Sequence, residues 1–231
     1  MNNNDFFDFE DKKYDFPFYN QENKQSQNGI KILLLSTIIF IFLIMGPIKL
    51  PNGQEQILLF IVTLIMLLLF TQGNIGTFFR LPEKKDIRLI IICYILFEVY
   101  YIALLSFFSL IHFQTTSGVN NDLNTWILLI NILQIIAEEI FKALMFLLVL
   151  KIIYSKGFSR KKSIIISTII VLLIFGVLHY NSYPNIIQIV FMQGLGGFAE
   201  LYPYIKTKNL TLSVLVHICI NFASWIPFML R

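Results

Sequence analysis

The sequence predicts an all-α fold, a polytopic bundle of about seven transmembrane helices, on three observations. Hydrophobic residues make up 56% of the 231 residues and charged residues only 14%, whereas a soluble domain of this size carries about 25% charged residues. The apolar residues form long continuous runs, which favour membrane helices over the short alternating strands of a barrel. The basic residues gather in alternate gaps between these runs, as they do in multi-pass membrane proteins.

The chain divides into a polar tail and seven apolar runs. Residues 1–29 contain six acidic residues and no apolar period, so we expect a mobile cytoplasmic tail. A spanning helix needs about 20 mostly apolar residues, and residues 30–231 are therefore assigned to one transmembrane domain. The predicted spans are 30–48, 57–72, 88–112, 126–150, 163–180, 185–205 and 209–230.

The distribution of Lys and Arg orients these spans. From the N-terminus onward, the tail and successive gaps hold four, one, four, none, five, none, two and one basic residues. Cytoplasmic loops carry the excess of such residues, so this alternation predicts a cytoplasmic N-terminus and requires the glycine-containing run at 185–205 to be a span. Because the charge of +4 is spread over loops, we expect a lipid bilayer and no nucleic acid as partner. The Ile, Asn and Lys usage favours a bacterial plasma membrane.

The fourth run carries ionisable side chains where the bilayer penalises them. Glu138 and Glu139 are adjacent, and Lys142 follows Glu138 by one helical turn. Each such residue costs about 2.5–3.5 kcal/mol at the membrane centre, which makes a functional role the first hypothesis. One Lys cannot neutralise both carboxylates, so the surplus carboxylate is a candidate general base. The alternative is a Glu138–Lys142 pair that only stabilises helix packing.

Two further runs contain polar residues at helical spacing. Phe175 and His179 lie four residues apart near the end of the fifth run, and His217 and Asn221 lie four apart in the seventh. His179 is a candidate catalytic residue or an interfacial one. Similarly, His217 and Asn221 are candidate catalytic residues or a pair that hydrogen-bonds helices together.

The three motifs together resemble the CAAX protease and bacteriocin-processing family of intramembrane proteases. They read EEIFKA, FGVLH and HICIN in the family's order, and the resemblance covers residues 85–230, approximately. It implies an endopeptidase without a cofactor, in which Glu138 and His179 activate water, Glu139 assists, and His217 and Asn221 stabilise the oxyanion. The implied substrates are peptides or lipidated membrane proteins, in CAAX-type or bacteriocin processing.

One position departs from the family pattern. The first motif usually continues to an Arg, but that position is Ala143 here, and Lys142 precedes it. An ammonium cannot form the bidentate fork of an Arg, so a non-catalytic relative, acting in bacteriocin immunity or as a regulator of a membrane partner, is the alternative function.

Two questions stay open at the level of sequence. Glu138, His179 and His217 are alternative zinc ligands. At 1.5 Å per residue, His217 is roughly 12 Å deep from the cytoplasmic side but His179 roughly 24 Å. The fifth helix therefore begins in the cytosol, or is strongly tilted, or His179 lies outside the site.

Glu98 has no identifiable partner, and we expect Glu200 to snorkel to the cytoplasmic interface.

Overall fold

The structure, a computed structural model, confirms the predicted all-α fold class. It describes residues 8, 10–17, 24–45, 50, 53–116, 125–183 and 185–229, with side chains from 28 onward in the first helix and up to 226 in the last. Within these residues all regular elements are helical. In order they are α1 (Lys24–Met45), α2 (Gln54–Thr71), η1 (Ile75–Thr77), α3 (Lys84–Leu110), α4 (Thr125–Ser155), α5 (Arg160–Val177), α6 (Ile186–Gln188), η2 (Ile189–Gly194), η3 (Leu195–Gly197), α7 (Phe198–Thr207) and α8 (Leu210–Met229).

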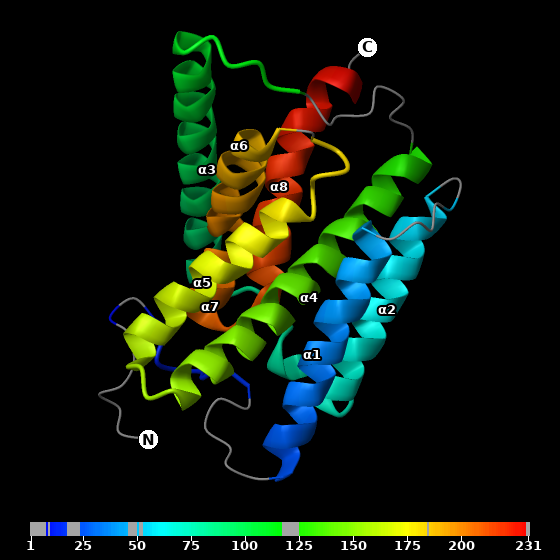
Figure 1. Ribbon diagram of the computed structural model, residues 1–231, viewed down its shortest axis with the longest axis vertical. Helices are drawn as coiled ribbons and strands as arrows, with labels where there is room; N and C mark the ends of the chain where they lie inside the picture. Colours follow the sequence, from blue (N-terminus) through cyan, green and yellow to red (C-terminus); the bar gives the residue numbers. More distant parts are fainter. Residues whose placement is uncertain are drawn as a thin grey trace.

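Helix α4 forms the centre of the bundle. It packs against α1 and α2 on one side and against α5, α7 and α8 on the other, as Figure 1 shows. Its middle, from Ala137 to Leu148, is buried throughout. Because neighbours surround this stretch, its polar side chains face protein and not lipid.

Helix α3 lies at the edge of the bundle, against α7, α8 and η3. Only 6% of its most apolar window is buried, so most of its side chains are left for lipid. Such an apolar, unburied surface is typical of a helix that faces a bilayer.

Three of the described helices are long and apolar enough to cross a membrane. Their apolar segments are Asn28–Met45, Gln54–Thr71 and Lys84–Leu110, and α8 adds a shorter apolar stretch, Leu210–Ile226. These helices indicate a membrane protein. The count of seven spans and the orientation of the N-terminus stay predictions.

The sixth predicted span is not one continuous helix. Residues 186–207 form α6, a π-helical turn η2, a 3-10 turn η3 and then α7. The cause is a close approach between η2 and α5: a Cβ atom on Gly176 would lie 2.9 Å from Cα of Gly194. Glycine at both positions lets the two backbones touch, and the irregular turns bring α7 under the site.

Residues 10–17, within the predicted mobile tail, pack against the helix bundle. Glu10 is buried, and its carboxylate binds Arg160 at the start of α5 through two hydrogen bonds of 2.7 and 2.9 Å. It also pairs with Lys208, just before α8, at 2.7 Å. The Phe16 ring is 3% exposed and packs 5.3 Å from the Phe146 ring. This segment, residues 10–17, is therefore part of the folded domain, and we call it the N-terminal strap.

The strap could not be recognised as ordered from its own sequence. The carboxylates of Glu10, Asp11 and Asp15 find partners between 74 and 198 positions away, and no local periodicity reports such pairing. Burial lowers the pKa of Lys208, and pairing with Glu10 opposes that change. The carboxylate of Glu10, together with Asp15, which also binds Arg160 at 2.7 Å, thus compensates the burial of two neighbouring cations.

We expect Glu10→Gln to destabilise the protein markedly. Without the carboxylate, Arg160 and Lys208 lose their shared buried counter-ion, and breaking a buried pair by removing one partner costs about 3–5 kcal/mol. The melting temperature in detergent measures the effect. Lys13→Gln is the control, since Lys13 pairs with Glu83 on the surface, where a pair contributes about 0–1 kcal/mol. Equal melting temperatures for the two variants would contradict the role of the strap.

Candidate active site

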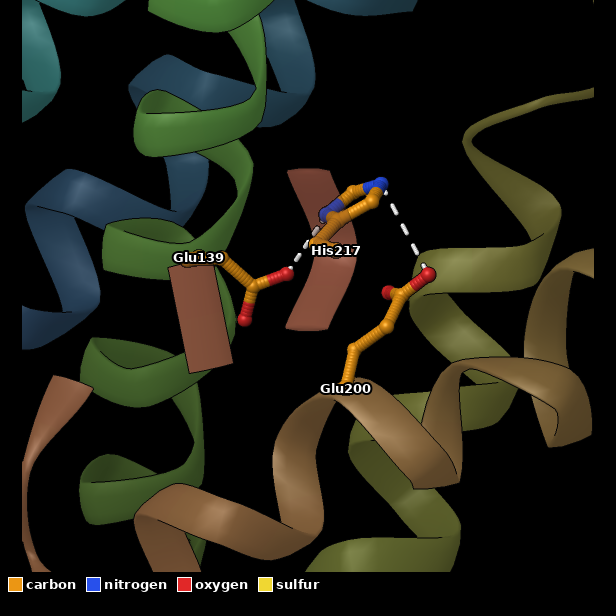
Figure 2. Close-up of side chains that lie close together, drawn as sticks. All are labelled: Glu139, Glu200 and His217. Atoms are coloured by element: carbon orange, nitrogen blue, oxygen red, sulfur yellow. Dashed lines mark hydrogen bonds and ion pairs between the residues drawn. The ribbon is translucent and has the colours of Figure 1, made fainter. Parts of the chain in front are cut away.

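Five ionisable side chains from three helices meet in the middle of the bundle. Glu138, Glu139 and Lys142 come from α4, Glu200 from α7 and His217 from α8, and each is at most 6% exposed. Glu139 and Lys142 lie one helical turn apart. Figure 2 shows the imidazole of His217 between the carboxylates of Glu139 and Glu200.

His217 is in direct contact with Glu139. The Nδ1 atom lies 2.7 Å from Oε1 of Glu139, a charge-assisted hydrogen-bond distance. The other ring nitrogen, Nε2, lies 3.6 Å from Oε1 of Glu200 and 3.9 Å from Oε2 of Glu138. These separations exceed a direct hydrogen bond, so Nε2 is flanked by carboxylates without being bonded by either.

Lys142 pairs with different carboxylates from the one its spacing predicted. Its ammonium lies 2.5 Å from Glu139, at i−3, and contacts Glu200 of α7. The alternative given above, a Glu138–Lys142 pair that only stabilises helix packing, is therefore wrong. The reason is that Glu138 is engaged on the opposite side, where Gln134 donates a 2.7 Å hydrogen bond to its Oε1.

Glu200 is the member of this group whose position the sequence did not indicate. The expectation that it snorkels to the cytoplasmic interface is wrong, since the residue is 6% exposed and bonded to Lys142. One signal was available: Glu200 is an ionisable residue within a predicted membrane span, and such residues are usually buried, paired and functional. The irregular turns η2 and η3, which place α7, were not predictable from periodicity.

His179 lies beyond the end of α5, one turn from Phe175. Its ring meets the Phe175 ring edge to face at 4.8 Å, and its Nδ1 lies 3.0 Å from the Phe175 carbonyl oxygen. The Phe175 ring in turn lies 4.4 Å from the Lys142 ammonium, a cation–π contact. Figure 1 shows α5 running obliquely to α3 and α8. The contact between Phe175 and Lys142 brings the end of α5 next to the site, and the tilt of this helix in the bilayer stays a prediction.

Asn221 lies one turn after His217 on α8 and is half-buried. Among the described residues its carboxamide makes no hydrogen bond, while its backbone carbonyl accepts one from Ser224. The structure therefore brings Glu138, Glu139 and His217 together and leaves His179 and Asn221 beside them without direct contact to that group.

The residues that could share a cation differ from the predicted set of zinc ligands. Among the described residues these are Glu139, Glu200 and His217, whose ligand atoms lie within 4.8 Å of one another, whereas the sequence pointed to Glu138, His179 and His217. Lys142 contacts two of the three, Glu139 and Glu200. Its ammonium thus already supplies a positive charge where a metal ion would bind.

Comparison with known families identifies one match. Residues 120–223 match the family model described as type II CAAX prenyl endopeptidase Rce1-like, which confirms the family that the three motifs resemble. The match covers slightly less than half of the chain and includes all the side chains of the site. Comparisons with curated proteins and with solved structures gave no match.

Replacing Lys142 should be among the most damaging changes in the protein. Lys142→Met removes the ammonium between the buried carboxylates of Glu139 and Glu200, a loss of about 3–5 kcal/mol, whereas Lys142→Arg keeps a cation between them. Thermal unfolding in detergent compares the two, with Lys156→Met, an exposed position after α4, as control. If Lys142→Met melts with the control, the ammonium does not hold the site together.

Proposed function

Given the match of residues 120–223 to the type II CAAX prenyl endopeptidase Rce1-like family, we propose that the chain is an intramembrane endopeptidase. Its substrates are peptides or membrane-associated proteins that reach the bilayer, including CAAX-type lipidated chains. The observation that carries the proposal is the buried meeting of Glu138 and Glu139 on α4 with His217 on α8. A protein from a bacterial plasma membrane, with its N-terminus in the cytoplasm, fits the charge distribution.

Glu138 is the general base in this mechanism. Gln134 occupies its Oε1, which leaves Oε2 for a water molecule. Glu138 takes a proton from this water as the oxygen attacks the scissile carbonyl carbon, with His179 assisting from the end of α5. When the C–N bond breaks, the proton passes to the leaving nitrogen, so the products are a carboxylic acid and an amine, which ionise to a carboxylate and an ammonium group.

His217 and Asn221 stabilise the oxyanion. His217 binds Glu139 through Nδ1 and has carboxylates near Nε2, which favours the imidazolium form, with a hydrogen on both nitrogens. In that form Nε2 can donate to the developing negative charge. The carboxamide of Asn221, one turn away, supplies a neutral donor.

The family pattern at Ala143 is compensated within the site. An Arg there would bind carboxylate through its fork, and Lys142 binds two carboxylates, Glu139 and Glu200, with a single ammonium. This pairing supports catalytic competence over the alternative, a non-catalytic membrane protein in bacteriocin immunity or regulation.

The proposal predicts that Glu138→Gln removes proteolysis without unfolding the protein. Loss of a general base lowers kcat by about 10²–10⁴-fold. Purified protein in lipid nanodiscs, with a fluorogenic farnesylated CAAX peptide as probe, measures cleavage. Glu98→Gln on α3 is the matched control, because this glutamate also lies in an apolar helix but outside the site. Wild-type turnover by folded Glu138→Gln would contradict Glu138 as the general base, and absence of turnover in the folded wild-type protein would favour the non-catalytic alternative.

We further expect cleavage to survive removal of metal. The Lys142 ammonium supplies the cation at the site, so dialysis against a chelator should leave kcat within about twofold, and metal analysis should find no stoichiometric zinc. Loss of activity on chelation, restored by zinc, would instead establish a metalloprotease.

A further inference from the structure

The side chains of the site form a closed cycle of contacts, and the proposed mechanism does not assign a role to every member of this cycle. Lys142 contacts Glu139 and Glu200, Glu139 contacts Nδ1 of His217, and Glu200 faces Nε2 of the same imidazole. This cycle of contacts therefore joins α4, α8 and α7 and returns to α4. Glu200 is the member that closes it.

The two oxygens of Glu200 have different neighbours. Oε2 binds the Lys142 ammonium, while Oε1 lies 3.6 Å from Nε2 of His217. Lys142 is fully buried, and its ammonium lies over the Phe175 ring. Since Lys142 is itself fixed by Glu139 and Phe175, it holds the Glu200 carboxylate short of a full hydrogen bond to His217.

The backbone around Glu200 is built to the same end. A Cβ atom on Gly197 would lie 3.7 Å from Oε2 of Glu200 and 3.5 Å from Leu172. The 3-10 turn η3 thus seats the start of α7 closely against α5. A Cβ on Gly197 would make only ordinary van der Waals contacts at these distances, so the carboxylate of Glu200 and the side chain of Leu172 pack closely around this turn.

We propose that Glu200 is a positioning residue of the active site: tethered by Lys142, it fixes the imidazole of His217 with Nε2 directed at the reacting carbonyl oxygen. Glu139 holds the ring at one nitrogen and Glu200 limits its rotation at the other. This inference rests on the proposed peptidase function for its catalytic consequence, but the placement of the imidazole is measurable without any substrate.

The spectroscopic test uses the small number of histidines. The chain has three, His112, His179 and His217, so ¹⁵N-histidine labelling in nanodiscs gives few signals, and a His217→Gln variant assigns those of His217. We expect Glu200→Gln to shift the His217 ring signals and Glu98→Gln to leave them unchanged. Should Glu200→Gln fail to accumulate, Glu200→Asp, which keeps the charge but withdraws it by one methylene, gives the same comparison.

The kinetic test separates positioning from folding. With the farnesylated CAAX peptide, Glu200→Gln should lower kcat by about ten- to a hundredfold, as a displaced catalytic group does, while KM changes by less than about threefold because ground-state binding is intact. Because Glu200→Gln also removes one partner of the buried Lys142 pair, the melting temperature should fall, and a cooperative unfolding transition above the assay temperature confirms that the fold is retained. A wild-type kcat in Glu200→Gln overturns the inference, whatever the spectra show.

The two proposals can fail separately. If the wild-type protein cleaves no probe but the His217 signals shift in Glu200→Gln, the positioning role stands and the peptidase proposal falls. If the wild-type protein is active and Glu200→Gln changes neither the signals nor kcat, the peptidase proposal stands and Glu200 has no positioning role.

Discussion

The buried ammonium of Lys142 is the interaction on which the rest of this site depends. It lies in the middle of the central helix α4, bonded to Glu139 of its own helix and to Glu200 of α7. Taking these charges out of water is unfavourable unless each has a close partner. The requirement for close partners determines how α4 and α7 pack together, and α8 joins them because His217 bonds to Glu139. Packing and chemistry are thus decided by the same atoms.

The fold class follows from the sequence because the bilayer leaves few alternatives. Continuous apolar runs in α1, α2 and α3 specify helices through backbone hydrogen bonding alone, and they appear where the runs do. The interrupted helix at residues 186–207 could not be anticipated in the same way. Its course depends on contact between Gly176 and Gly194, a tertiary approach that no single run encodes.

The site shows the same division between local and non-local information. Glu138, Glu139 and His217 stand out because ionisable groups are rare in apolar helices, and the structure brings them together. The partner of Lys142 was predicted from helical spacing, which allows i+3 and i+4 neighbours equally. Glu200, on another helix, also contacts the Lys142 ammonium and thereby favours its pairing with Glu139 over Glu138. Spacing rules within one helix cannot predict how η3 places Glu200. The chemical role of a residue can therefore be predicted from its type more readily than its interaction partner can.

The N-terminal strap has a consequence for the order in which the protein is made. Glu10 precedes its buried partners Arg160 and Lys208 by at least 150 residues. Because chains are synthesised from the N-terminus, this carboxylate can pair with them only after most of the bundle has been made. Docking of the strap is then a late event of biogenesis, and it completes the fold only in chains whose last helices have already been inserted.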